Sequence, residues 1–273
     1  MLALYYIILF LFGIAIGSFL NVLVLRMNTG MTIGGRSQCF SCGKKLSFKE
    51  LIPVFSFLFQ KGRCRGCSSK ISIQYMLVEL ATAILFVAVG YKFADYSLYN
   101  FANVAYLILG LIMVSVFVAI FVYDLRHKII PDSFVVALSI VGLLLISVSV
   151  YSGLVEPIQF AIQTVSGLIL FAPFYLLWLI SSGKWIGLGD GKLALAFGIL
   201  LPFSSAISGI VIAFWIGAIF GVALIVISRS KKVTLKSEVP FAPFLIVGVL
   251  ISYFFTIDIF HINFLIEYAK YFL

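Results

Sequence analysis

Long apolar runs constrain this chain more than any other feature of its sequence. A helix that crosses a bilayer needs about 20 largely apolar residues at 1.5 Å per residue. Of the 273 residues, 63% are hydrophobic and only 11% are charged, which excludes a soluble domain, a disordered chain and a disulfide-rich secreted protein. The apolar runs that we interpret as membrane spans are 3–25, 73–90, 101–123, 134–150, 158–180, 191–201, 206–227 and 239–257.

The sixth and seventh runs form one apolar stretch that is too long for a single span. Residues 191–227 are 37 residues, which would make one helix of about 55 Å, nearly twice the thickness of the hydrocarbon core. We therefore expect the chain to fold back at Pro202, with Phe203, Ser204 and Ser205 in the turn, although the first arm is short. The sequence predicts an all-α polytopic membrane protein with about eight transmembrane helices.

The basic residues predict the orientation of these spans. With eight spans, 17 of the 19 Lys and Arg residues lie on one side, and the other side keeps only Lys92 and Lys270. The positive-inside rule makes the basic side cytoplasmic and places both termini outside. The first run has no Lys or Arg before Arg26, so we interpret it as a retained anchor rather than a signal peptide. The net charge of +9 therefore indicates a lipid bilayer as partner and no nucleic acid.

The loop between the first two spans, residues 26–72, contains all four cysteines of the chain. Cys39, Cys42, Cys64 and Cys67 follow the pattern C-x2-C-x21-C-x2-C, which resembles the spacing of zinc ribbons. A reducing cytoplasm disfavours disulfides, and a loop of this size needs a staple to form a stable unit. The pattern predicts a closed, structural zinc site, with a redox pair or a metal-free loop as the alternatives.

Two of the ten acidic residues stand out because the predicted topology places them at the same membrane face. Asp124 ends the third span and Asp190 begins the sixth. Two carboxylates that share a proton can activate water and protonate a leaving amine, as aspartic proteases do. Three alternatives remain open: Asp190 and Asp132 are helix N-caps, the carboxylates serve a proton-coupled transporter, or the protein is a zinc-loop scaffold that tolerates loss of either aspartate.

Four segments resemble motifs of the type IV prepilin peptidase family, a family of membrane aspartic proteases. Residues 17–26, GSFLNVLVLR, match GSFxNVxxxR, and residues 51–67, LIPVFSFLFQKGRCRGC, match LIPxxSxxxxxGxCxxC. Residues 75–79, YMLVE, match YxxVE, and residues 187–192, GLGDGK, match GxGDxK. The similarity covers about residues 13–192. One departure is Phe40, where many relatives have proline after the first cysteine.

The resemblance implies a function and a site. It implies that Asp124 and Asp190 are the catalytic aspartates, with Gly187 and Gly189 as supporting residues of the GxGD motif. The expected activity is cleavage of a short basic leader from type IV prepilins or pseudopilins, at the cytoplasmic face of the bacterial inner membrane. Members with four cysteines commonly then methylate the new N-terminus with S-adenosylmethionine. No residue is assigned to that cofactor, because no glycine-rich nucleotide loop follows a strand.

Three further residues are candidates for a supporting role. Glu79 lies inside the second span and is expected to pair with Arg26 or Asn21, with a part in methyl transfer as the alternative. Lys192 is either a snorkelling anchor or a contact of the substrate or the aspartates, and Asp132 either caps a helix or supports the site. We expect three domains, namely a first transmembrane helix (1–25), a cysteine loop (26–72) and a seven-helix peptidase domain (73–273).

Overall fold

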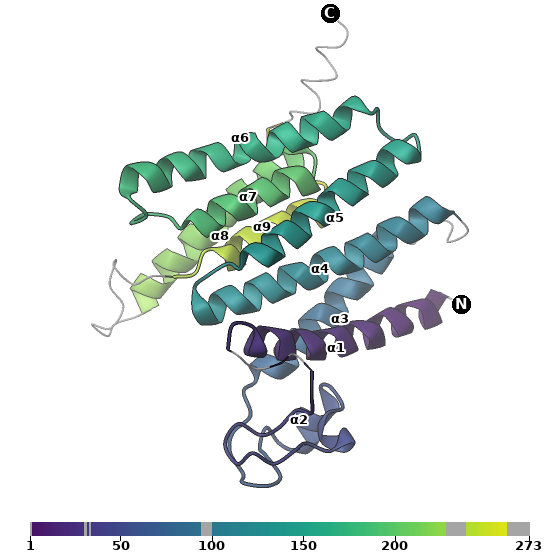
Figure 1. Ribbon diagram of the computed structural model, residues 1–273, viewed down its shortest axis with the longest axis vertical. Helices are drawn as coiled ribbons and strands as arrows, with labels where there is room; N and C mark the ends of the chain where they lie inside the picture. Colours follow the sequence, from purple (N-terminus) through teal and green to yellow (C-terminus); the bar gives the residue numbers. More distant parts are fainter. Residues whose placement is uncertain (1, 30–31, 33, 94–99, 228–238, 261–273) are drawn as a thin grey trace, which may run out of the picture. The chain divides into compact units, whose positions relative to one another are not determined.

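The computed structural model describes residues 2–29, 32, 34–93, 100–227 and 239–260. The expected basic loop 228–238 and Lys270 lie outside these residues. The described chain is all-α (Figure 1), with two isolated β-bridges in the cysteine loop. Its elements are α1 (Leu2–Arg26), η1 (Phe48–Glu50), α2 (Phe55–Phe59), α3 (Gln74–Lys92), α4 (Phe101–His127), α5 (Asp132–Tyr151), α6 (Ile158–Ser181), α7 (Leu188–Leu200), α8 (Phe203–Ile227) and α9 (Ala242–Phe255).

The structure confirms the predicted fold class. Among the described residues, six helices are long and apolar enough to cross a membrane, namely α1, α3, α4, α5, α6 and α8. The helices α7 and α9 match the two other predicted runs but are only 13 and 14 residues long. At 1.5 Å per residue they reach about 20 Å, which is less than the hydrocarbon thickness.

The predicted break at Pro202 is present and is shorter than expected. Helix α7 ends at Leu200, and Leu201 is extended, with φ −125° and ψ 155°. A residue that precedes proline disfavours the α conformation, which explains why the helix stops there. Helix α8 begins at Phe203, so Ser204 and Ser205 belong to the helix and not to the turn.

The chain divides into two compact units, Met1–Leu98 with Gly110–Val122 and Tyr99–Leu109 with Tyr123–Leu273. In the first unit, α1 and α3 run antiparallel in close contact. If Gly13 carried a Cβ atom, that atom would lie 2.6 Å from the Ala83 Cα, and a Cβ at Gly17 would lie 2.7 Å from the Glu79 Cα. Both distances are too short for a side chain, so glycine is required at these positions. Small residues four apart allow two membrane helices to approach this closely.

In the second unit, the short helix α7 packs against α5 and α6. A Cβ at Gly142 of α5 would lie 2.8 Å from the Leu200 Cα, and one at Gly198 would lie 2.6 Å from the Gly167 Cα of α6. Most side chains of α7 after its first turn are buried. The fold therefore surrounds α7 with other helices and fixes the position of its first turn, which carries Asp190.

Candidate active site and cysteine cluster

Asp124 lies in the last turn of α4 and is 5% exposed. The helix ends at His127, and its C-cap, Lys128, adopts the left-handed conformation with φ 54°. The Lys128 N–H donates to the Asp124 carbonyl oxygen at 2.8 Å and so closes the final turn. A non-glycine residue in this conformation costs energy. The chain therefore turns sharply directly after Asp124 and leads into α5.

Asp190 is the third residue of α7, and the N-cap of that helix is Gly187. The alternative that Asp190 is itself the N-cap is therefore wrong. Its carboxylate accepts a hydrogen bond from the Gly187 N–H, which is half of a capping box. Asp132 is likewise not a cap, because Pro131 occupies that position of α5. Asp132 is the first residue of α5 and Asp190 the third residue of α7, so each lies inside the helix that it was expected to cap.

The two glycines on either side of Asp190, Gly189 and Gly191, allow close packing of the first turn of α7. A Cβ at Gly189 would lie 3.3 Å from the Ile130 Cβ, in the turn between α4 and α5. A Cβ at Gly191 would lie 3.0 Å from the Phe174 Cβ on α6. The glycines therefore allow the first turn of α7 to approach both neighbours, including the segment that follows Asp124.

The carboxylates of Asp124 and Asp190 lie close enough to interact electrostatically. Each accepts a backbone N–H from the start of a helix, Asp190 from Gly187 and Asp124 from Ala242 at the first residue of α9. The Asp124 Oδ2 is buried and has no hydrogen-bond partner in the part of the chain that the structure describes. A buried, unsatisfied carboxylate oxygen is costly unless a ligand or water uses it.

Ala242 is a site residue that the sequence analysis missed. It belongs to the segment Pro240-Phe241-Ala242-Pro243, and it takes part through its backbone alone. The N–H at the first position of a helix has no partner within the helix, so it is available to Asp124. The two prolines of this segment are a sequence signal of a helix start.

Lys192 and Asp132, two predicted supporting residues, contact each other. The Lys192 Nζ lies 2.7 Å from the Asp132 Oδ1, and both side chains are partly exposed to solvent. This ion pair connects the fifth residue of α7 to the first residue of α5. An exposed pair contributes only about 0–1 kcal/mol, so we interpret it as an orienting contact rather than a source of stability.

Glu79 belongs to the first compact unit and is 6% exposed. Its Oε2 accepts the Val54 N–H at 2.7 Å, and its carboxylate also contacts the Ser18 side chain. Asn21, one of its expected partners, donates from Nδ2 to the Tyr75 carbonyl oxygen at 3.1 Å. Glu79 thus connects the cysteine loop to α3, a contact that its place in an apolar run did not indicate.

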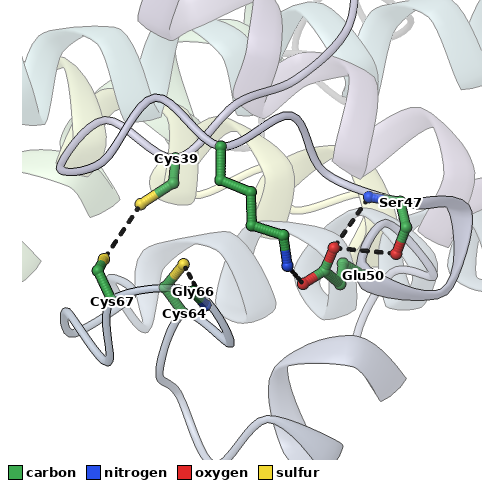
Figure 2. Close-up of polar contacts among 7 residues, drawn as sticks. Cys39, Ser47, Glu50, Cys64, Gly66 and Cys67 are labelled. Carbon is green, nitrogen blue, oxygen red and sulfur yellow. Dashed lines mark hydrogen bonds and ion pairs between the residues drawn. The ribbon is translucent and has the colours of Figure 1, made fainter.

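The four cysteines of the loop form one cluster. Their Sγ atoms all lie within 4.8 Å of one another, and the Cys39 and Cys67 Sγ atoms are 3.9 Å apart (Figure 2). Four sulfurs about 2.3 Å from a tetrahedral zinc ion are separated by about 3.8 Å. All four cysteines are free of disulfides. The residues therefore suit a closed four-thiolate metal site.

The cluster is built from two turns with the same hydrogen bonds. The Cys39 N–H donates to Lys44 O and the Cys64 N–H to Ser69 O, both at 2.9 Å. Gly43 N–H then donates to Cys39 O, as Ser68 N–H does to Cys64 O. The two knuckles are thus a structural repeat of 25 residues that the sequence analysis did not detect.

Backbone N–H groups point at the sulfurs of both knuckles. The N–H groups of Cys42 and Ser41 lower the pKa of the Cys39 thiol to about 6, and the Gly66 N–H donates to the Cys64 Sγ at 3.3 Å (Figure 2). Such donors stabilise the thiolate form, which is the form that binds metal. This arrangement favours the metal-site hypothesis over the metal-free loop.

Glu50 fixes the first knuckle to the rest of the loop. Its carboxylate accepts hydrogen bonds from the Ser47 N–H and hydroxyl and an ion pair from Lys44 at 2.9 Å (Figure 2). The Ser47 N–H first, and then Lys44, lower the pKa of Glu50 to about 2. Glu50 is only 7% exposed, so this charge is buried and paired although it lies in a loop rich in basic residues.

Comparisons with known proteins found two matching family models and several similar proteins. Residues 111–222 match the model of the type IV leader peptidase family, and residues 11–93 match the bacterial peptidase A24 N-terminal domain. A protein of Bacillus subtilis is 32% identical over 253 residues, which cover 91% of this chain and 93% of the relative. A protein of Aeromonas salmonicida is 30% identical over 272 residues, which cover 90% of this chain and 89% of the relative.

A third relative, from Klebsiella pneumoniae, is 34% identical over 204 residues, which cover 72% of this chain and 85% of the relative. All three relatives carry the name prepilin leader peptidase/N-methyltransferase. No solved structure matches the chain significantly.

Proposed function

We propose that this chain, which belongs to the type IV leader peptidase family (peptidase A24), removes the leader from prepilins or pseudopilins with Asp124 and Asp190. It is a multi-pass membrane protein of a bacterial family of aspartic peptidases. The observation that carries the assignment of the site is the proximity of two carboxylates, one of which has a buried, unpartnered oxygen. Family membership favours the peptidase over the transporter and scaffold alternatives.

The two carboxylates suit hydrolysis of a peptide bond. One proton shared by the pair leaves one carboxylate as a base and the other as an acid. The base takes a proton from water, whose oxygen attacks the scissile carbonyl carbon, while the acid donates a hydrogen bond to the carbonyl oxygen. The acid then protonates the leaving amine as the carbon–nitrogen bond breaks. In this scheme Ala242 and Gly187 hold the two carboxylates in position through their N–H groups.

The family indicates the substrate, and the distribution of charge indicates the orientation. A leader that is short and basic precedes the apolar helix of a prepilin, and we propose that cleavage occurs at the cytoplasmic face of the inner membrane. The nine Lys and Arg residues of 26–72 support this orientation through the positive-inside rule. The system served is a type IV pilus, a type II secretion system or a competence system, and no nucleic acid takes part.

We further propose that the metal is zinc and that the enzyme methylates the new N-terminus. Cys39, Cys42, Cys64 and Cys67 would hold zinc as a structural ion that folds residues 26–72. The relatives' name includes N-methyltransferase, and S-adenosylmethionine would supply the methyl group. Residues 73–273 would then carry the peptidase site and residues 1–25 an anchoring helix.

The decisive experiment is the processing of a synthetic prepilin by the purified full-length protein. We expect mass spectrometry to detect release of the leader, and a gain of one methyl group on the product when S-adenosylmethionine is added. The control is a peptide in which the residues on both sides of the junction are D-amino acids. An intact prepilin, together with proton uptake by proteoliposomes, would instead support the transporter.

The hydrogen bond from Ala242 to Asp124 gives a separate prediction. Replacing the Ala242 residue by lactic acid converts its amide into an ester and removes only the N–H. A hydrogen bond to a charged group contributes about 1.5–3 kcal/mol, so we expect kcat to fall about 10- to 100-fold with little change in KM. The matched control is Ala242→Gly, which keeps the N–H. Equal activity of the two variants would contradict a positioning role of this N–H.

A further inference from the structure

The cysteine loop contains a strained turn at Val54. The Phe55 N–H donates to the Pro53 carbonyl oxygen at 2.7 Å, and Val54 between them has φ 64° and ψ −57°. These values define a γ-turn of the rare, strained kind, and a β-branched residue is particularly unfavourable there. Such a conformation persists only where the surrounding structure holds it. Two contacts hold this turn, one polar and one apolar.

Both contacts lie well inside the membrane helices. The Val54 N–H donates to Glu79, five residues into α3, and the Val54 side chain is buried in one cluster with Ile14 and Ala83. Glu79 lies opposite Gly17, nine residues before the end of α1. At 1.5 Å per residue the turn is therefore about 7–14 Å inside the ends of the two helices. Non-helical backbone at such depth needs a polar partner, and Glu79 supplies one.

The residues around this turn expose large apolar side chains. The exposed fractions are 38% for Ile52, 51% for Phe55, 56% for Leu58 and 77% for Phe59, the last three on the short helix α2. A water-facing loop rarely presents so contiguous an apolar patch. The patch lies next to the Val54 turn, which itself contacts residues of both α1 and α3.

The charges beside this patch fit an anionic lipid surface. Lys49 and Lys61 flank the segment and are exposed. Glu50, the one acidic residue of 26–72, is buried and paired with Lys44. Apolar side chains bordered by lysines are typical of segments that lie in a membrane interface.

We propose that residues 51–59 form a re-entrant anchor that inserts into the lipid leaflet at the Arg26 end of α1. Glu79 receives the backbone at the deepest point, the apolar side chains of α2 contact acyl chains, and the flanking lysines contact anionic headgroups. The cysteine cluster is thereby held at the membrane surface on two sides, by α1 and α3 and by this anchor.

Fluorescence quenching by brominated lipids tests this proposal in the full-length protein. Trp178, Trp185 and Trp215 are first replaced by phenylalanine, and a single tryptophan is introduced as Phe59→Trp. The matched control is Phe40→Trp, because Phe40 is 68% exposed and lies in the first cysteine knuckle. Both variants are reconstituted in phosphatidylethanolamine and phosphatidylglycerol vesicles with brominated acyl chains, and zinc content confirms that the loop is folded.

We expect the brominated chains to quench the Phe59→Trp variant at least about threefold more than the control, because interfacial side chains lie about 5–10 Å into the headgroup boundary. Aqueous iodide should quench the control more strongly. Equal quenching of both variants by iodide would overturn the proposal. Protection of Phe59→Trp from both quenchers would also overturn it, since protein would then cover the patch. Quenching by lipid that disappears on adding a prepilin peptide would reassign the patch to substrate.

Discussion

Asp124→Asn and Asp190→Asn are each expected to abolish leader cleavage while the protein still inserts and folds. Asparagine has the same shape as aspartate but cannot accept a proton from water or deliver one to the leaving amine. General acid–base catalysis contributes about 10²–10⁴-fold per group, so kcat should fall by at least that factor. The measurement is the rate of leader release from a synthetic prepilin, at matched amounts of purified protein.

The structure also predicts that these two variants remain folded. Asp124 caps no helix, and the Asn side chain can still accept the Ala242 N–H through its Oδ1. Asp190 is the third residue of α7, where loss of the negative charge costs about 0.3–1 kcal/mol. The control is Glu156→Gln, which removes an exposed carboxylate outside the site. Normal processing by either aspartate variant would show that the pair is not the catalytic site.

Much of this architecture follows from simple features of the sequence. The lengths of the apolar runs predict the helices, because the bilayer fixes how many residues a span needs. Pro202 predicts the break between α7 and α8, since the residue before proline leaves the helical conformation. The same topology predicts that Asp124 and Asp190 lie at one face, and in the structure the charge of Asp124 is close enough to influence the Asp190 carboxyl. These features are local or depend on length, so one sequence is enough to find them.

Other parts of the site depend on contacts that carry no signal in the sequence. Ala242 contributes a backbone N–H, which any residue except proline offers, so its type does not indicate its role. Whether Asp190 is the N-cap or the third residue of α7 depends on where the helix starts. The helix propensities of the residues do not fix that start to within three residues. The contacts of Val54 with Glu79, Ile14 and Ala83 join residues that are far apart in the sequence, so the pattern of charges and apolar runs does not indicate them.

Loss of the metal is the second change with a large expected effect. Replacing Cys64, the one buried cysteine, by serine should abolish stoichiometric zinc and unfold the two cysteine knuckles. Structural zinc sites contribute about 10–16 kcal/mol of binding free energy, and a loop of this size lacks an apolar core that could compensate. Zinc is measured by elemental analysis, and unfolding by limited proteolysis of the loop. Ser41→Ala is the matched control, because it changes the same cluster but keeps the N–H that points at Cys39.

The effect of Cys64→Ser on activity distinguishes leader cleavage from N-terminal methylation. Asp124, Asp190 and the N–H groups that hold them all belong to the second compact unit, whereas the four cysteines belong to the first. We therefore expect Cys64→Ser to retain leader cleavage and to lose N-terminal methylation, measured on the same prepilin by mass spectrometry. If cleavage falls as far as methylation, the cysteine loop is instead a scaffold that the peptidase site needs. Stoichiometric zinc in the variant would contradict the four-thiolate site itself, because three remaining thiolates would then be enough to hold the ion.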